Sequence, residues 1–276
     1  LKFMASWGIM GSDGNVDSYP NEYTYYHSYR DVWRRTGNPD FGLNNDNSVE
    51  QIDFNTAGNL GIGWMQSREV NLGVEGLFLS ERLSMKLNYF NELRSDIIVR
   101  RYGSYPIISG NLLPWENYEE VNNQGIELLL SFSDQIRDFS YSFGVNGSFN
   151  QSEYKVVDEP DYPYDYMKAE GNPVDAQYGL VADGFFSDEN DIANSPVQMY
   201  GEVKPGDIKY KDLNGDGIIN NEDIRKIGEW FPDLTYGLDL TLSYKGLQIY
   251  IAGAGVQGLN ALTNSRYYSV HGEDKY

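Results

Sequence analysis

LTYGLDLTLSYKGLQIYIAGAGVQ, residues 234–257, alternates apolar and polar side chains on both sides of a two-residue break. Apolar residues take every second position over residues 236–244, and again over 247–251. Because successive side chains of a strand point to opposite faces, this pattern predicts two β-strands that each have one apolar face. The break, Lys245-Gly246, leaves room only for a tight turn, so we expect an antiparallel hairpin.

The same alternation recurs upstream and predicts further strands of similar length. The links between the strands are short and long in strict alternation. In an outer-membrane β-barrel the periplasmic turns are short and the extracellular loops long, whereas nothing in a soluble sandwich imposes that pattern. The strands also exceed the usual soluble length of about 5–6 residues. The predicted strands cover residues 1–11, 67–80, 83–101, 122–134, 138–155, 233–245 and 246–257, with short links at 80–82, 134–137 and 245–246 and long ones at 12–66, 102–121 and 156–232.

These features predict an all-β fold class, in which the chain is part of a large antiparallel transmembrane β-barrel with long extracellular loops. Residues 1–276 would all belong to that barrel, and residues 156–232 would form an extracellular insert within it. The sequence has no initiator methionine, and its first residues already resemble a strand. We therefore expect this sequence to be an internal segment of a longer protein.

Composition excludes several classes of function. The chain has 41 Asp+Glu against 21 Lys+Arg, and the formal charge of −20 argues against a nucleic-acid partner. It has no cysteine and two histidines, which excludes thiolate metal sites and leaves no persuasive Ser-His-Asp arrangement. Glu75, Glu127 and Asp239 fall on polar strand faces, where lining of a lumen is the default interpretation and a glycosidase pair the weaker one. We expect that the protein is not an enzyme.

Residues 212–223, DLNGDGIINNED, have the spacing of a calcium-binding loop. Oxygen-bearing side chains stand at loop positions 1, 3 and 5, a glycine turns the chain at position 6, and position 7 offers its carbonyl oxygen. The acid at position 12 is Asp where Glu is usual, and Ile219 at position 8 would fix the loop to a core. The alternative is an Asx-rich turn without metal. The predicted ligands are Asp212, Asn214, Asp216, the carbonyl of Ile218, and Asp223.

The segment after this loop, Ile224–Gly228, is predicted to form one helical turn that stops at the glycine. The sequence contains a single loop of this kind, so a paired calcium sensor is not expected. Bound Ca²⁺ would have a structural role and would stiffen the 156–232 insert.

Aromatic residues crowd the first two long links, and such rings can stack on sugars or on peptide side chains. The alternative is that they pack the loops together or meet a partner subunit. The predicted substrate-binding residues are Tyr25, Tyr29 and Trp33 in the first link, Tyr105 in the second, and Trp115 close to its end.

Residues 203–212, VKPGDIKYKD, run directly into the calcium-type loop, and Ile227-Gly228 and 232–238, PDLTYGL, follow it. Together with Tyr244-Lys245-Gly246-Leu247, this series closely resembles the signature of SusC/RagA-type TonB-dependent outer-membrane transporters. Asp at loop position 12 is typical of that family's version of the loop. Supporting similarity is found in residues 71–75, 87–98, 121–127 and 179–186.

The resemblance implies a barrel of about 22 strands with an N-terminal plug, of which this chain would be part of the C-terminal half. It implies import of oligosaccharides or oligopeptides across the outer membrane of a Gram-negative cell, with a SusD-like surface lipoprotein as a lid and TonB supplying energy through the plug. The barrel would contact outer-membrane lipid. The runner-up interpretation is a secreted, calcium-stabilised β-sandwich that binds carbohydrate, because a second sheet would produce the same alternation as lipid.

Overall fold

The structure is a computed structural model. It describes residues 1–12, 59, 61–105 and 113–261, together with short backbone stretches between residues 33 and 54. The chain divides into two compact units, which are described separately below. Unit 1 comprises Leu1–Glu75, Leu87–Ile126 and Gln151–Val174, and unit 2 comprises Gly76–Lys86, Glu127–Asn150 and Asp175–Tyr276.

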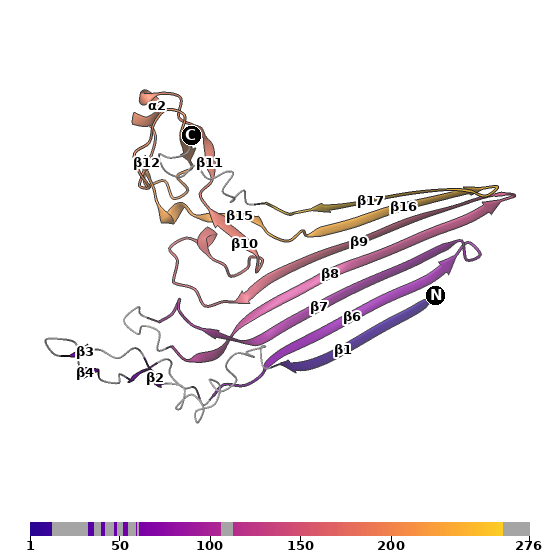
Figure 1. Ribbon diagram of the computed structural model, residues 1–276, viewed down its shortest axis with the longest axis horizontal. Coiled ribbons are helices and arrows are strands. Elements are labelled where there is room, and N and C mark those ends of the chain that lie inside the picture. The colour runs from indigo at the N-terminus through magenta and orange to yellow at the C-terminus, as the bar shows by residue number, and fades with distance from the viewer. Residues whose placement is uncertain are drawn as a thin grey trace. The chain divides into compact units, whose positions relative to one another are not determined.

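Long strands dominate the fold and form one seven-stranded sheet, in which they lie side by side (Figure 1). Their order in the sheet is also their order along the chain. Neighbouring strands pair antiparallel, as the registers of β1 with β6, β9 with β16, and β16 with β17 show. This is the meander expected of a barrel wall, and the all-β prediction is confirmed. The strands are β1 (Lys2–Ser12), β6 (Met65–Phe78), β7 (Leu83–Arg100), β8 (Trp115–Ile136), β9 (Phe139–Val156), β16 (Leu234–Tyr244) and β17 (Leu247–Gln257).

The hairpin of β16 and β17 has the predicted register. Its last pair is Tyr244 with Leu247, so that Lys245 and Gly246 form the whole turn. Both turn residues have positive φ, 47° and 87°. Positive φ at both central residues is what a type I′ hairpin turn requires, and glycine adopts it without strain. The two-residue break in the sequence therefore fixes the pairing of every residue in this hairpin.

One predicted strand is longer in the structure than the sequence suggested. Strand β8 begins at Trp115 and not near residue 122. Residues 115–121, WENYEEV, lack the apolar–polar alternation by which the strand was predicted. The ladder of backbone hydrogen bonds continues through them regardless, because strand pairing does not depend on side-chain polarity.

One face of the sheet is apolar and exposed. Trp7 and Leu72 lie on it in unit 1, and Leu238 and Ile251 lie on it in unit 2; all four side chains are exposed. Contact with water would be unfavourable for so much apolar surface, whereas contact with hydrocarbon would not. Among the described residues, no helix is long and apolar enough to cross a bilayer.

Aromatic side chains gather near the strand ends of unit 2. The rings of Phe132 and Phe139 lie 6.0 and 5.8 Å from the ring of Tyr141, beside the short turn between β8 and β9. Tyr236 and Tyr244 stand near opposite ends of β16. Eight residues at about 3.3 Å each separate them by roughly 26 Å along the strand. At a strand tilt of about 40° this is roughly 20 Å of height, which fits within the apolar band of about 25 Å in an outer-membrane barrel.

Short elements occupy the long links. In the first link only backbone pairing is described, between β2 (Trp33–Arg35) and β5 (Ile52–Phe54) and between β3 (Asp40–Phe41) and β4 (Asn47–Ser48). The third link, between β9 and β16, holds three two-stranded sheets: β10 with β15, β11 with β13, and, in parallel, β12 with β14. Its elements are η3 (Asp165–Met167), β10 (Ala176–Gly179), β11 (Ala182–Phe185), α2 (Glu189–Ala193), β12 (Val197–Gln198), β13 (Ile208–Tyr210), β14 (Ile218–Ile219), η4 (Asn221–Asp223) and β15 (Arg225–Glu229).

The predicted helical turn over 224–228 is wrong. Residues Arg225–Glu229 form strand β15, which pairs antiparallel with β10. The glycine at position 228 suggested the end of a helical turn, but the backbone groups of this segment bond to a strand that lies far away in the sequence. Tertiary pairing overrides local propensity over such a short segment. The loop itself contains one short helical turn, the 3₁₀ turn η4.

Candidate functional site

The calcium-type loop of unit 2 is curled around its first residue. The two carboxylate oxygens of Asp212 accept hydrogen bonds from the backbone N–H groups of Gly215, at 2.6 Å, and Gly217, at 2.8 Å. Both glycines have positive φ, 78° and 82°. A residue with a Cβ would be strained there, so the two glycines permit the sharp turn that brings their amides to Asp212.

The next two predicted ligands, Asn214 and Asp216, also accept hydrogen bonds from backbone N–H groups of the loop. The Oδ1 atom of Asn214 accepts from the N–H of Asp216 at 3.0 Å, and Oδ1 of Asp216 accepts from the N–H of Ile218 at 2.8 Å. Each is a short Asx-type turn, in which a side chain bonds to the backbone two residues further on. The side chains at loop positions 1, 3 and 5 are thus held by the loop's own amides. Each bonded oxygen retains a second lone pair for a cation.

The side chain of Asp223 lies inside the loop and connects two of its segments by hydrogen bonds. Its side chain is fully buried, and its two oxygens accept from the N–H groups of Leu213 at 2.7 Å and Asn220 at 2.9 Å. The bond to Leu213 joins the two ends of the loop, and the bond to Asn220 is half of a capping box on η4. A buried carboxylate without such donors would be strongly unfavourable, so these amides explain how the acid can be buried here.

The middle of the loop is fixed by strand pairing. Val197 donates its N–H to the carbonyl of Gly217, and Met199 donates to that of Ile219, both at 3.0 Å. Because successive carbonyls of a strand point in opposite directions, the carbonyl of Ile218 faces away from this ladder and is available at loop position 7. The side chain of Ile219 is 1% exposed, which confirms that it fixes the loop to a core.

The acidic side chains alone do not form a metal site. Among the described residues, no three His, Cys, Asp or Glu side chains converge closely enough to hold an ion. The loop combines carboxylates with an amide oxygen and a carbonyl oxygen, which is the mixed, oxygen-only ligand set that Ca²⁺ accepts. The residues present therefore fit a hard cation, although their carboxylates bond to backbone amides in this structure.

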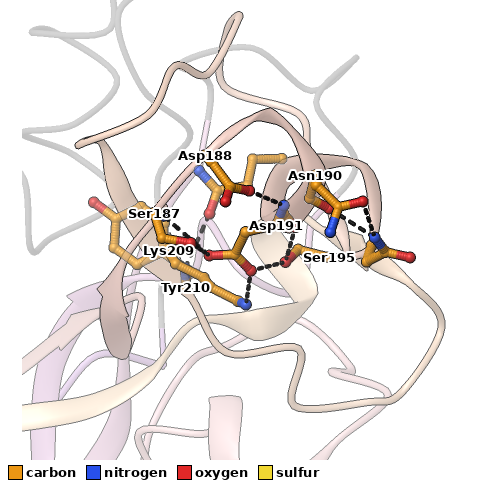
Figure 2. Close-up of polar contacts among 9 residues, drawn as sticks. Ser187, Asp188, Asn190, Asp191, Ser195, Lys209 and Tyr210 are labelled. Atoms are coloured by element: carbon orange, nitrogen blue, oxygen red, sulfur yellow. Dashed lines mark hydrogen bonds and ion pairs between the residues drawn. The ribbon is translucent and has the colours of Figure 1, made fainter.

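A second polar cluster supports the segment that leads into the loop (Figure 2). Asp191, in the short helix α2, accepts a hydrogen bond from the Lys209 ammonium group of β13 at 2.9 Å, and others from the N–H of Ser187 and the hydroxyl of Ser195. Asp188 caps α2 by accepting from the N–H of Asp191 at 2.8 Å. The bond from Lys209 lowers the pKa of Asp191 below its ordinary value. Sequence reasoning missed this cluster, because no local motif links residue 191 to residue 209.

Arg101 stands just before the second long link, in unit 1, and contacts three side chains at once. Its guanidinium lies 3.8 Å from the centroid of the Tyr118 ring and 3.4 Å from carboxylate oxygens of both Glu116 and Asp158. The Asp158 side chain is only 4% exposed. A planar guanidinium can stack on a ring and bind carboxylates at its edge at the same time. Arg101 therefore ties two long links together at the ends of strands β7, β8 and β9.

The predicted substrate residues Tyr105 and Trp115 lie in the same unit but face different neighbours. The hydroxyl of Tyr105 donates to Glu116 at 2.8 Å, a bond that raises the pKa of Tyr105. The Trp115 ring lies under the guanidinium of Arg100, at 4.8 Å. Because Trp115 and Glu116 are successive strand residues, they point to opposite faces of β8. Tyr105, on the side of Glu116, therefore does not share a surface with Trp115.

The remaining predicted substrate residues are not located by the structure. Tyr25 and Tyr29 lie outside the described residues. Trp33 is described only as backbone, where it pairs with Phe54 between β2 and β5. The structure thus places two of the five predicted aromatic side chains.

A family model that matches most of the chain shows which family the protein belongs to. The family model of the TonB dependent receptor-like β-barrel matches residues 16–271. The chain belongs to this family. The TonB-dependent receptors P3 and P26 of Formosa agariphila are each 25% identical to it, over 78% and 80% of this chain and 23% of their own length. The structure of the RagAB peptide transporter covers 93% of this chain and 26% of its own, with a TM-score of 0.61 and 19% identity.

This TonB-dependent receptor barrel chain spans about a quarter of the length of the relatives that it matches. The likeness to RagAB shows that the two share a fold, here a section of barrel wall whose sheet is not closed. The resemblance that residues 203–247 carry to SusC/RagA-type transporters is confirmed. Members of this family are receptors and transporters of the outer membrane.

Proposed function

We propose that this chain is a section of the barrel wall of an active transporter that imports an oligosaccharide or an oligopeptide across the outer membrane of a Gram-negative cell. The observation that carries the proposal is the seven-stranded sheet, which runs in chain order and keeps an apolar face exposed. Family membership supports it. A secreted β-sandwich would bury that face under a second sheet, whereas in the described residues these apolar side chains remain exposed.

The whole transporter would act with two protein partners. TonB would supply energy through a plug in the barrel, and a SusD-like surface lipoprotein would cover the extracellular opening. The name of the RagAB structures, a peptide transporter or importer, describes that protein and supports a peptide as one of the two cargo classes. The chain itself would carry out no covalent chemistry. Within the transporter, this chain would form part of the barrel wall, contact lipid and present the long links outside the cell.

Uptake by cells tests this function. In a strain that lacks the gene, a fluorescent oligopeptide and a fluorescent oligosaccharide are supplied in turn, and the complete protein is restored with and without a functional TonB. We expect one cargo to enter only when both proteins are present. Entry at equal rates without the transporter, or a full-length protein that stays soluble without detergent, would contradict the proposal.

Structural calcium in the 156–232 insert is part of the proposal. Asp212, Asn214 and Asp216 present side-chain oxygens in the required spacing, and the loop is already curled by its own amides. Bound Ca²⁺ would neutralise part of the local negative charge and hold the loop's carboxylates together. The insert itself would lie outside the cell, because it joins β9 to β16 at the end of the sheet where the links are long.

A further inference from the structure

An arginine stands on the apolar face of unit 1, where a charge is unexpected. Arg68 of β6 pairs directly with Ile9 of β1. Residues that pair across antiparallel strands point to the same face, so Arg68 shares the face of Ile9 and of Trp7, two residues away on β1. All three side chains are exposed. A guanidinium among exposed apolar side chains needs an explanation, because a charge is stable only beside water or an opposite charge.

The acids of these two strands do not neutralise Arg68. Strand β1 has no acid, and the acids of β6, Glu69 and Glu75, stand at odd positions and so on the opposite face. Lys2 lies on that opposite face and pairs with Glu75. Among the residues that the structure describes, none forms an ion pair with Arg68. Its positive charge is therefore available to an anion from outside the described chain.

Two tryptophan rings flank Arg68 on this face. Trp7 is a diagonal neighbour of Arg68 across the two strands, and the Cβ atoms of such neighbours lie about 7–8 Å apart. Trp64, just before β6, lies over Gly11, where a Cβ would come within 2.8 Å of its ring. Gly11 pairs with Gln66 and is the diagonal neighbour of Arg68 on the other side. Both rings are 70% exposed, as is typical of tryptophans at the border between hydrocarbon and lipid headgroups.

The position of Arg68 along β6 fits that border. Strand β6 begins after the first long link, and ten residues separate Arg68 from Phe78, where the strand ends at a short turn. At about 3.3 Å per residue and a tilt of about 40°, these residues cover roughly 25 Å of height, which is the height of the apolar band of an outer-membrane barrel. Arg68 would therefore stand at the extracellular edge of the band, level with the headgroups of the outer leaflet.

An apolar groove lies on the same face, nearer to the short turn. Leu72 of β6 borders it, four residues or roughly 13 Å along the strand from Arg68. Its volume of about 460 Å³ is in the range of ligand-binding sites. The apolar and aromatic residues that line it are Phe3, Ala5, Leu72, Val74, Leu87 and Tyr89. An acyl chain lying in this groove would have its headgroup on the side of Arg68.

We propose that Arg68, between Trp7 and Trp64, binds the phosphate group of an outer-leaflet lipid, one acyl chain of which lies in the groove that Leu72 borders. This inference rests on the function proposed above, which places the sheet in a membrane. A guanidinium can donate two parallel hydrogen bonds to a phosphate, and an indole N–H can donate a further one. Charge and shape select the ligand: a lipid without an anionic group would leave Arg68 unpaired, and an acidic protein segment would leave the groove without a hydrocarbon chain.

Native mass spectrometry of the complete transporter tests the site. Detergent-solubilised protein is mixed with phosphatidylglycerol, or with a diacylglycerol that has the same acyl chains but no phosphate, and the tightly bound lipid is quantified. We expect Arg68→Gln to reduce retention of phosphatidylglycerol about tenfold or more, as the loss of a hydrogen bond to a charged group would. Retention of the diacylglycerol should not change. Arg68→Lys keeps the positive charge and should retain most of the phosphatidylglycerol.

Arg94→Gln is the matched control, an arginine of the same unit on the opposite face. The Oε1 atom of Glu92 accepts from the Ser67 hydroxyl at 2.6 Å and from Nε of Arg94 at 2.8 Å. Ser67 precedes Arg68 on β6 and points to the other face, so Arg94 lies on that other face as well. This variant should retain phosphatidylglycerol like the unaltered protein. The heat-induced shift in gel mobility of the barrel reports the folding of every variant.

Each other outcome overturns the proposal in a recognisable way. Equal retention of phosphatidylglycerol by Arg68→Gln and the unaltered protein means that the headgroup binds elsewhere, while the barrel itself stands. An equal loss in Arg94→Gln means that the lipid responds only to overall charge. Displacement of the lipid by millimolar inorganic phosphate means that Arg68 takes a free anion. A complete protein that stays soluble without detergent and retains neither lipid would refute the function proposed above, and the lipid site with it.

Discussion

Individual side chains in the insert act mainly by accepting hydrogen bonds from the backbone. Asp212 and Asp223 each accept two backbone N–H groups, and Asp191 accepts one together with the ammonium group of Lys209. A chain segment without a large core can be held in one conformation by such bonds, since each one removes an unsatisfied donor. The acids of the insert are therefore structural as well as charged.

Removing the carboxylate at loop position 5 should abolish metal binding. In Asp216→Ala the loop loses one ligand and also the acceptor for the N–H of Ile218. We expect calorimetry to detect Ca²⁺ uptake by the unaltered protein and none by the variant. Asp183→Ala, an acid of the same segment outside the loop, is the control. Unchanged uptake by Asp216→Ala would refute the calcium assignment.

The ion pair of Asp191 and Lys209 should make α2 sensitive to acid. The pKa of Asp191 is lowered below its ordinary value of 3.8, first by the bond from Lys209. A lowered pKa means that the pair stabilises the fold above pH 3.8, and that this contribution is lost as the pH falls from there through the folded-state pKa. We expect the amide of Ser187, which bonds to Asp191, to lose exchange protection in that range.

Asp191→Asn supplies the comparison for this acid effect. The amide side chain does not titrate in this range, so protection of the Ser187 amide should be weaker at neutral pH and should change little as the pH falls below 3.8. Identical acid profiles for the variant and the unaltered protein would show that the pair does not control α2.

At the scale of elements, strand pairing can be predicted where apolar–polar alternation occurs on both sides of a tight turn. The turn and the pairing of the β16–β17 hairpin could be predicted because Lys245-Gly246 fixes the register and alternation fixes the faces. The start of β8 could not be predicted, since the segment WENYEEV has no apolar–polar alternation. Strand β15 could not be predicted either, since its partner β10 lies about fifty residues upstream. The curled shape of the calcium-type loop was predictable because the residues that form it are local in sequence, whereas its metal ligands stay a prediction. The Arg101 cluster was not, because Asp158 is 57 residues away.

The insert depends on a small number of inward-facing side chains. Ile219→Ala removes a fully buried side chain from a segment with little other core, and we expect a loss of about 2–5 kcal/mol in the local stability of the insert. Its neighbour Ile218 is exposed, so Ile218→Ala should cost far less. Limited proteolysis of the insert in the intact protein measures both. Equal protease sensitivity of the two variants would contradict the assignment of inner and outer faces.

At the scale of the whole molecule, the apolar face of the long sheet determines the environment of the protein. Leu240 lies on this face near the middle of β16, and Thr241, the next residue, points to the opposite, polar face. In a membrane barrel the first would contact lipid and the second the lumen. We expect Leu240→Arg to destabilise the folded barrel by about 2–4 kcal/mol in lipid, and Thr241→Arg to have a small effect.

Folding titrations of the complete protein into lipid vesicles measure this pair of variants. The control is a conservative change at each site, Leu240→Val and Thr241→Ser, which should both fold like the unaltered protein. A larger loss for Thr241→Arg than for Leu240→Arg would mean that the two faces have been assigned the wrong way round.

Fluorescence quenching by lipids that carry a quencher in the acyl chain tests most directly whether the apolar face touches the membrane. A fluorophore is attached to Leu240→Cys or Thr241→Cys in the complete protein, reconstituted in bilayers. Strong quenching at residue 240 and little at residue 241 is the predicted result. Equal, weak quenching at both positions would mean that protein covers the apolar face, and would contradict the barrel wall described here.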